Sequence, residues 1–440
     1  MQTTFETLEG LVRKLTIEVP AQEVEQGVEK RLRAERPSIR VAGFRKGKVP
    51  PEILKQKFGA EIRQRALGDL IDESYRKALV EGQHTPAAAP EIELFSGVKE
   101  GENLKFAATF EIVPEVVVKG LDGLALTLTQ TEITDADVEE MLKTLQRQQG
   151  QYIVDANHAA DSNDRVTIDF VGRLNGEAFE GGSGNDVPVV IGAGQMLPDF
   201  ENGLRGVKAG EEKVFEVNFP EQYHAENLAG KKTEFTAQVK KVERLQLPEI
   251  NNEFAKRFGI AGGDLEAFKK AIRDNMVREL GNAERRIKRE RLFDALVAAN
   301  SEQAIPNSQV AYEVERMAKN INLEKQIPDA EQRKQLAQTI FGEQARRHVL
   351  LSLLLGKLFA ERNIQLDAAR VEERLNTIAS TYEKPEEVKA WYRKDQNARN
   401  SLASAVLEEQ LIDSLCDAAN ISYEAKTFQE VMQINNQLPR

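Results

Sequence analysis

Residues 165–172 read Arg-Val-Thr-Ile-Asp-Phe-Val-Gly, an alternation of polar and apolar side chains that is typical of a half-buried β-strand. Asn175 and Gly176 follow shortly after, and Asn-Gly is a strong signal for a two-residue hairpin turn. The chain is therefore expected to reverse here and to pair antiparallel with the next extended segment. This stretch decides the fold of the middle of the chain.

The neighbouring sequence continues the same pattern. Further strands are expected at residues 187–191, 212–219 and 233–242. One short helix fits residues 198–204, because it begins with a proline. We interpret residues 151–247 as a small antiparallel β domain. Many unrelated proteins share such a pattern, so the pattern by itself indicates no activity.

The N-terminal part, residues 1–113, indicates an α+β domain. Residues 12–19 alternate like a strand, and Pro20 ends it. The other expected elements are helices at residues 21–35, 51–58 and 61–81 and strands at residues 91–95 and 104–113.

A basic segment interrupts this domain: residues 43–51 read Gly-Phe-Arg-Lys-Gly-Lys-Val-Pro-Pro. Glycine permits tight turns and proline cannot continue a helix, so the segment is predicted to be a loop. Between Lys30 and Arg65 there are twelve Lys or Arg against three Asp or Glu. A solvated turn is the plain interpretation. The apolar Phe44 at the loop tip and the lopsided charge favour a docking site for an anionic partner.

The remaining residues divide into a connector and a helical region. Residues 114–150 are interpreted as a connector, which is extended over residues 116–131 and in which Thr134 then begins a helix with a capping pattern. Residues 248–440 are predicted to be almost entirely helical, with long helices at 264–299, 331–363, 367–382, 386–394 and 398–419. Residues 251–440 have 29 basic and 29 acidic residues, and their apolar stripes are interrupted. Helices that are polar around most of their surface span solvent between other parts of a protein or bind partners, rather than fill a large core. The alternative is a helical bundle used only for dimerisation.

Composition limits the class of protein. A chain of 440 residues is expected to form two to four domains. The single cysteine, Cys416, excludes an intrachain disulfide framework, and the four scattered histidines indicate no zinc site. No signal peptide and no apolar run of ~20 residues is found, so a cytoplasmic protein without a membrane span is expected. The net charge of −11 argues against a general nucleic-acid-binding protein.

The basic loop resembles a known signature. Its pattern Gly43-Phe44-Arg45-x-Gly47-Lys48-x-Pro50 is similar to the ribosome-docking motif of the trigger factor family of bacterial chaperones. Residues 247–259 and the order of the parts extend the resemblance to the whole chain. It implies a multidomain α+β protein: a ribosome-docking domain (1–113), a connector that folds back on the helices (114–150), an isomerase domain (151–247) and an extended all-α substrate-binding domain (248–440). The implied docking residues are Gly43, Phe44, Arg45, Lys46, Gly47, Lys48 and Pro50.

The β domain resembles a second family. Its motifs at residues 169–172, 175–180, 191–204 and 219–223 are similar to those of FKBP-type peptidyl-prolyl isomerases. The resemblance implies a pocket with the catalytic set Phe170, Phe179, Glu180, Val187, Met196, Leu197, Phe200, Tyr223 and Phe235. Phe200 would form its floor, where many relatives carry Trp, and Glu180 stands where they carry Asp. Singly, each aromatic residue fits an ordinary core. As an ordered set with its glycines, they favour the pocket.

Isomerisation of an X–Pro bond needs neither a nucleophile nor a cofactor. The barrier of ~18–20 kcal/mol reflects the loss of amide resonance on twisting. Since a twisted amide is less polar than a planar one, a dry aromatic pocket favours the transition state. Tyr223 is expected to donate a hydrogen bond to the substrate carbonyl. No cofactor or metal is expected.

The two resemblances imply an ATP-independent, ribosome-associated chaperone that also isomerises X–Pro bonds. Its implied partners are the large ribosomal subunit near the exit tunnel and nascent or unfolded polypeptides. A contact with ribosomal protein is implied, and a contact with rRNA stays open. A homodimer of the free protein also stays open. The alternative is a free cytosolic prolyl isomerase whose helices recruit clients or dimerise. Ribosome binding that depends on Phe44, Arg45 and Lys46 separates the two.

Overall fold

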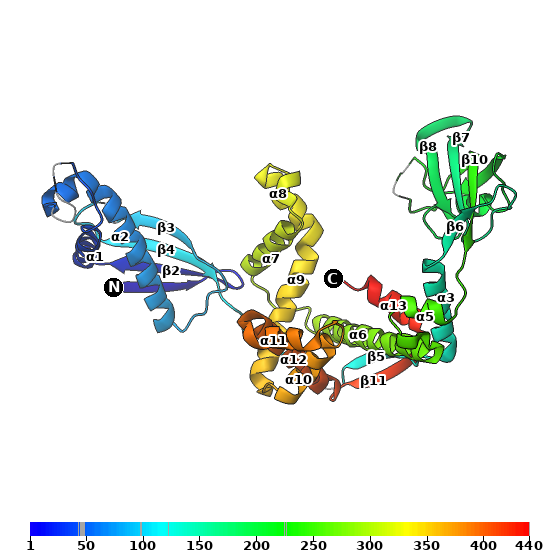
Figure 1. Ribbon diagram of the computed structural model, residues 1–440. Coiled ribbons are helices and arrows are strands. Elements are labelled where there is room, and N and C mark those ends of the chain that lie inside the picture. The colour runs from blue at the N-terminus through cyan, green and yellow to red at the C-terminus, as the bar shows by residue number, and fades with distance from the viewer. Residues whose placement is uncertain are drawn as a thin grey trace. The chain divides into compact units, whose positions relative to one another are not determined.

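A computed structural model describes residues 1–42, 44, 49–96, 99–121, 123–223, 225 and 227–439 (Figure 1). The chain forms two compact units, and each is built from two separate stretches of sequence. The first combines Met1–Leu128 with Ile287–Glu424, and the second combines Thr129–Arg286 with Ala425–Arg440. Within the described ranges, no helix is long and apolar enough to cross a membrane.

The first unit begins with a four-stranded antiparallel sheet in the order β1-β2-β4-β3 and two helices packed on it (Figure 1, blue to cyan). The elements are β1 (Gln2–Thr7), β2 (Val12–Val19), α1 (Ala21–Glu35), α2 (Pro51–Glu81), β3 (Glu91–Ser96) and β4 (Leu104–Glu111). Ile17 of β2 lies opposite Phe106 of β4, and both are buried with Val24 of α1 and Tyr75 of α2. Alternate strand residues therefore face the helices, as the alternation predicts.

The predicted α+β arrangement is confirmed, except that strand β1 was not predicted and the division of one helix is wrong. The strand at 12–19 and the helix at 21–35 have the predicted bounds. The two helices predicted at 51–58 and 61–81 are one continuous helix, α2. Gly59 does not break it, because a glycine costs a helix only about 1 kcal/mol. Leu54 and Ile62, on either side of Gly59, are buried in the same cluster and hold the helix together there.

Seven helices follow in the C-terminal half: α6 (Leu265–Ala299), α7 (Asn307–Asn320), α8 (Leu323–Gln326), α9 (Ala330–Arg362), α10 (Ala368–Ala379), α11 (Pro385–Lys394) and α12 (Gln396–Cys416). The first unit contains α6 from Ile287 onward and the other six helices. Leu292 of α6, Leu358 of α9 and Leu411 of α12 share one buried cluster. The long helices predicted from the sequence are confirmed to within a few residues at their ends.

The connector packs on these helices within the first unit. Val116 is buried with Ile305, and Leu126 is buried with Leu292. The Asn300 side chain accepts a hydrogen bond from Lys119 N at 2.8 Å and donates one to Lys119 O at 3.1 Å. The connector thus folds back on the helical region, as the family resemblance implies.

One two-stranded sheet was not predicted. It joins β5 (Ala125–Gln130) to β11 (Asn420–Ala425), so the mostly helical C-terminal region also contains a strand. The sequence analysis expected helix as far as residue 419 and assigned nothing to β11. The partners lie almost 300 residues apart, and a six-residue strand gives only a weak local signal.

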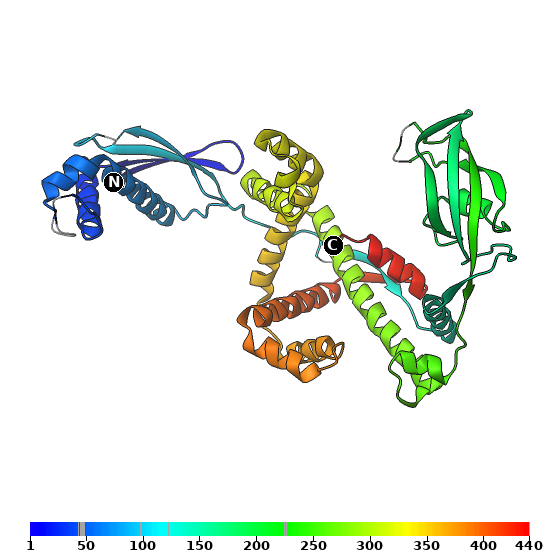
Figure 2. The ribbon, with the colours of Figure 1, turned by 45° about the horizontal axis from the view of Figure 1, so that its top comes forward.

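The second unit contains the five-stranded antiparallel sheet expected from residues 165–172 (Figure 2, green). Its strands are β6 (Gln151–Val154), β7 (Arg165–Leu174), β8 (Glu177–Val190), β9 (Glu212–Asn218) and β10 (Lys232–Gln246), in the order β6-β10-β7-β8 with β9 beside β10. Asn175 and Gly176 connect β7 to β8 with φ of 54° and 89°, which confirms the predicted hairpin.

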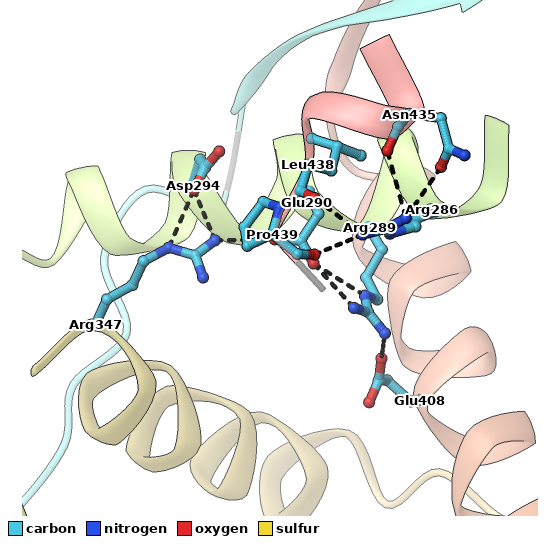
Figure 3. Close-up of polar contacts among 9 residues, drawn as sticks. All are labelled: Arg286, Arg289, Glu290, Asp294, Arg347, Glu408, Asn435, Leu438 and Pro439. Carbon is cyan, nitrogen blue, oxygen red and sulfur yellow. Dashed lines mark hydrogen bonds and ion pairs between the residues drawn. The ribbon is translucent and has the colours of Figure 1, made fainter. Parts of the chain in front are cut away.

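Short helices complete this unit: α3 (Asp135–Gln148), α4 (Pro198–Gly203), α5 (Asn252–Arg257) and α13 (Phe428–Gln437), with a single 3₁₀ turn at Ala261–Gly263. Thr134 and Asp137 form the predicted capping box at the start of α3. Arg286 of α6 donates to the carbonyl oxygens of Leu438 and Pro439 at 3.1 and 2.6 Å and so ties down the segment after α13 (Figure 3).

Candidate functional site

A cavity of about 530 Å³ opens in the second unit between the β-sheet and the short helix α4. Eight of the nine residues predicted for the isomerase pocket line it: Phe170, Phe179, Glu180, Met196, Leu197, Phe200, Tyr223 and Phe235. They come from β7, β8, β10, the start of α4 and the loops that precede α4 and follow β9. The fold thus brings together residues that are up to 65 positions apart in the sequence.

The ninth predicted residue, Val187, is not among the described residues that line the cavity. It is half-buried and packs against the same core. Further residues line the cavity that the sequence analysis did not assign to the pocket: Gly181, Gly182, Gly194, Gln195, Pro198, Val217, Phe219, Ala225 and Leu228. Of these, Phe219 gave a usable signal, because it is an aromatic residue directly after β9 and before Pro220.

The floor of the cavity is a cluster of aromatic rings. Phe200 is only 4% exposed, and its ring centroid lies 5.3 Å from that of Phe170 and 5.1 Å from that of Phe235. Both contacts are edge-to-face, which is a favourable arrangement for aromatic side chains. The ring of Phe179 packs against Phe235 in the same manner, at 6.0 Å. The apolar surface is therefore held in a defined shape.

Two glycines let these rings pack directly on the backbone. A Cβ atom added at Gly182 would lie 2.5 Å from the ring of Phe179. One added at Gly172 would lie 2.6 Å from the ring of Phe235. Real Cβ atoms do not approach other atoms so closely, so any side chain at either position would force the neighbouring ring to move.

One buried carboxylate organises the loop before α4. Glu201 is 4% exposed, and its side chain accepts hydrogen bonds from Gly192 N, Gly194 N and Met196 N at 2.8, 3.2 and 2.9 Å. Burial alone would raise the pKa of Glu201, but these N–H groups outweigh it and lower the pKa. This residue fixes the loop that brings Met196 and Leu197 to the cavity.

The predicted docking loop is described only in part. Phe44 lies at the surface with 40% of its side chain exposed, and Pro50 precedes α2 as its N-cap residue. Gly43, Arg45, Lys46, Gly47 and Lys48 lie outside the described residues. Val41 and Val49, close to the two ends of the loop, are buried in one cluster. Phe44 is therefore displayed from an anchored base rather than packed into the core.

A second cavity, of about 1010 Å³, lies in the first unit among α6, α7, α9, α12 and residues 87–89. Its wall has an ionic network around the buried Glu290 (Figure 3). Glu290 is 6% exposed and accepts hydrogen bonds from Arg289 at 2.9 Å and Arg347 at 3.2 Å. Glu408 lies 3.6 Å from Arg289, and burial raises its pKa. The wall therefore joins charged groups to apolar side chains such as Phe293.

Sequence profiles match three parts of the chain. The profile described as "Bacterial trigger factor protein (TF)" matches residues 1–145, and its C-terminal counterpart matches residues 264–417. The profile described as "FKBP-type peptidyl-prolyl cis-trans isomerase" matches residues 156–242. Together, the aromatic cavity, the antiparallel sheet and this match define an FKBP-type peptidyl-prolyl isomerase domain within a larger chain.

Full-length relatives extend the comparison. A trigger factor of Dichelobacter nodosus (strain VCS1703A) is 55% identical over 438 residues, covering 100% of both chains. A trigger factor of Pseudomonas putida (strain W619) is 40% identical and covers 98% of each chain. A solved structure described as "Promiscuous Substrate Recognition in Folding and Assembly Activities of the Trigger Factor Chaperone" aligns with a TM-score of 0.45 and 20% identity, over 98% of this chain and 100% of that one.

The chain belongs to the trigger factor family. It is accordingly a ribosome-associated chaperone with peptidyl-prolyl cis/trans isomerase activity, and it acts on unfolded polypeptides. A free isomerase without a ribosomal role is not favoured.

Proposed function

We propose that the protein docks on the large ribosomal subunit beside the exit tunnel through residues 43–50. In that position it shields nascent chains in the cytoplasm without using ATP. The observation that carries the proposal is the exposure of Phe44, an apolar side chain displayed between the buried Val41 and Val49. An exposed aromatic residue flanked by cations suits a partner with both apolar and anionic surface, such as a ribosomal protein with neighbouring rRNA phosphates.

Each of the four predicted segments has a separate role. Residues 1–113 dock, residues 114–150 connect, residues 151–247 isomerise prolyl bonds and residues 248–440 hold the client. Exposed apolar side chains are scattered over the helical region, among them Tyr312, Ile340, Tyr382 and Trp391. Separate small apolar patches within a charged surface bind an unfolded chain weakly and without strong selectivity. The free protein can be tested for a homodimer by sedimentation velocity at several concentrations.

The isomerase reaction is assigned to the aromatic cavity of the second unit. A proline ring would rest on Phe200, between Phe170 and Phe235, where little water remains around the amide. The twisted amide is the less polar state, so this environment lowers its free energy relative to the planar state. Tyr223, at the cavity, would donate a hydrogen bond to the substrate carbonyl. The assignment is supported by the convergence of eight predicted residues on one cavity.

Co-sedimentation with ribosomes tests the docking proposal. The wild-type chain is expected to pellet with the large subunit, whereas a Phe44→Ala, Arg45→Ala, Lys46→Ala variant stays in the supernatant. Circular dichroism should show that the variant is folded. A suitable control is Lys14→Ala, because this cation belongs to the same domain but lies on β2. Equal sedimentation of the triple variant and the wild type would show that the loop is not the dock.

Substitutions at the floor test the isomerase assignment. Phe200→Ala is expected to reduce kcat/KM for prolyl peptides at least tenfold, because it removes most of the apolar floor. Phe200→Trp keeps an aromatic floor and should retain measurable activity. Prevention of aggregation of an unfolded client should be unchanged in both variants. Full activity of Phe200→Ala would exclude this cavity as the isomerase site.

A further inference from the structure

We propose that Phe215 on β9 is a positioning residue of the isomerase: it fixes the floor residue Phe200 and thereby sets the size of the cyclic residue that the cavity accepts. The inference rests on the proposed function of the cavity, because it requires that the ring of a prolyl residue lies on Phe200. It goes further by naming a residue outside the cavity that determines specificity. It also names a class of substrate that this residue excludes, the X–pipecolyl bonds, whose ring has one more methylene than proline.

The ring of Phe200 contacts three other aromatic rings. Phe170 and Phe235 line the cavity and pack edge-to-face on Phe200, with 5.3 and 5.1 Å between the ring centroids. The third ring belongs to Phe215, at 5.3 Å and an interplanar angle of 77°. Phe215 is not among the described residues that line the cavity. It therefore supports the floor without lining the space that a substrate fills, and it acts on the substrate through Phe200.

The strand register fixes the direction of the Phe215 side chain. Phe215 lies directly opposite Phe235 in the antiparallel pair of β9 and β10. Residues in such a pair point to the same face of the sheet, and the two rings stack at 6.4 Å with an interplanar angle of 16°. Phe215 is half-buried and packs against the core of this domain. The sheet therefore holds the Phe215 ring on the face that also carries the cavity wall.

The backbone of α4 lies directly on the Phe215 ring. Gly203 belongs to the same short helix as Phe200. A Cβ atom added at Gly203 would lie 2.5 Å from Cγ and 2.8 Å from Cε2 of Phe215, and closer still to Cδ2. Because the nearest atoms all belong to this ring, its thickness sets how closely the end of α4 approaches β9. Phe215 thus acts as a spacer between the sheet and the helix that carries the floor.

A spacer at this position limits the depth of the cavity. Phe200 is 4% exposed, and it cannot retreat from the cavity while the Phe215 ring fills the space beside it. Without that ring, Phe200 and α4 can move into part of the void, so the floor lies deeper. A deeper floor loses contact with the five-membered ring of proline and has room for the six-membered ring of pipecolic acid.

The experiment measures isomerisation of acetyl-Ala-Leu-Pro-Phe-amide and of its pipecolyl analogue by NMR exchange spectroscopy with the full-length protein. The measured quantity is the prolyl-to-pipecolyl ratio of kcat/KM. One methylene in an apolar pocket changes selectivity by roughly 10–200-fold, so the wild type is expected to favour the prolyl peptide by about tenfold or more. Unfolded molecules contribute to neither rate. A variant that is partly unfolded therefore still reports the ratio of its folded molecules.

Substitutions at Phe215 should lower this ratio in a graded way. Phe215→Ala is expected to lower it about threefold or more, because the floor then fits the larger ring better. Phe215→Leu keeps Cγ beneath Gly203 and should lower the ratio less. Val214→Ala is the matched control, because Val214 precedes Phe215 on β9, is 54% exposed and points to the opposite face. Wild-type ratios in Phe215→Ala and Phe215→Leu would refute the inference.

Gly203→Ala tests the spacer from the side of the helix. In the wild-type background the added methyl group collides with the Phe215 ring, so α4 must shift and kcat/KM for the prolyl peptide should fall several-fold. In a Phe215→Ala background the methyl group enters the space left by the ring. Gly203→Ala should then cause no further loss and should raise the prolyl-to-pipecolyl ratio towards the wild-type value. Equal losses in both backgrounds would overturn the spacer role.

Phe200→Ala with the prolyl peptide tests the cavity itself. Full activity of this variant would mean that the cavity is not the isomerase site, and the inference would fail together with the proposed function. If Phe200→Ala lost its activity while both Phe215 variants kept the wild-type ratio, only the inference would fail. The two failures are therefore distinguishable in one set of measurements.

Discussion

The backbone N–H of Met196 donates a hydrogen bond to Glu201 Oε1 at 2.9 Å. This bond ties the loop before α4 to the helix that also carries Phe200. One short helix thus supplies the floor of the cavity and the carboxylate that fixes its wall. The position of Met196 and Leu197 consequently depends on a residue whose side chain does not line the cavity.

The first prediction is that Glu201→Gln impairs the isomerase more than the fold. A neutral amide accepts hydrogen bonds more weakly than a carboxylate and must place its own NH₂ group among N–H donors. We expect kcat/KM to fall about tenfold and the domain to lose about 1–3 kcal/mol of stability. Peptide isomerisation assays and hydrogen exchange of residues 192–197 measure the two effects.

A matched control for this substitution is Asp199→Asn on the same helix. Its carboxylate accepts hydrogen bonds from Asn218 on the neighbouring strand, not from the cavity loop. The Asp199→Asn variant should lose stability without a comparable loss of isomerase activity. Because the folded pKa of Glu201 is lowered from 4.5, its stabilisation is present above that pH and is lost as the pH falls through the folded pKa. Equal isomerase activity of Glu201→Gln and the wild type would show that the Glu201 carboxylate is not needed to position the loop before α4.

The second prediction concerns the close contact between Gly182 and Phe179. Gly182→Ala would place a methyl group 2.5 Å from the Phe179 ring, so the ring must move out of the cavity wall. We expect a several-fold loss of isomerase activity with little change in ribosome binding. In a Phe179→Ala background, the same alanine should have no further effect, because the ring that it displaces is gone. An additive double variant would show that Gly182 matters for another reason.

Much of the fold was predictable because its signals are local. The alternation of residues 165–172 and the Asn175–Gly176 turn specify a hairpin within a few residues. The strands β1 and β6 and the β5–β11 pair were not predicted, since pairing between distant segments leaves little trace in either one. The helix α2 was predicted as two helices, but it continues through Gly59, because burial of Leu54 and Ile62 outweighs the low helix propensity of glycine.

The candidate site was predictable for a different reason. Its residues stand in an ordered motif that resembles a known family, and eight of the nine predicted residues converge on one cavity. The role of Glu201 was not predictable, because its three partners are backbone N–H groups, which every residue but proline has. Only the three-dimensional course of the loop shows that these groups point at one carboxylate.

The third prediction is a pH dependence set by Glu243 on β10. Arg165 of β7 donates two hydrogen bonds to Glu243, at 2.7 and 2.8 Å, and with Lys241 it lowers the pKa of Glu243 to about 2. The folded pKa lies below the unfolded value of about 4.5. The stabilisation is therefore complete above pH 4.5 and is lost as the pH falls towards 2.

Glu243→Gln should remove this part of the pH dependence. At pH 7 the variant is expected to be about 1–3 kcal/mol less stable, because it leaves the Arg165 guanidinium without its charged partner. Urea-dependent hydrogen exchange of β7 and β10 at pH 5 and pH 3 measures the difference. Glu216→Gln is the control, since its pair with Lys232 is exposed on both sides. If the stability of Glu243→Gln fell between pH 5 and pH 3 as much as that of the wild type, Glu243 would not be the source of this pH dependence.

The fourth prediction concerns the ionic network of the helical region (Figure 3). Arg347 of α9 lies 3.2 Å from Glu290 and 2.7 Å from Asp294, both on α6. Glu290 is 6% exposed, so Arg347→Ala would leave a buried carboxylate with Arg289 as its remaining partner in the network. We expect a loss of about 2–4 kcal/mol, because a buried charge that loses a partner is poorly compensated.

Neutralising the carboxylate should recover part of that loss. The double variant Arg347→Ala, Glu290→Gln is expected to be more stable than Arg347→Ala alone, since it no longer buries an undercompensated charge. Urea unfolding followed by the fluorescence of Trp391, the single tryptophan, reports on this region. Arg393→Ala is the control: it breaks the exposed pair with Glu372 and should cost less than about 1 kcal/mol. Equal losses in Arg347→Ala and Arg393→Ala would mean that the network contributes no more than an ordinary surface pair.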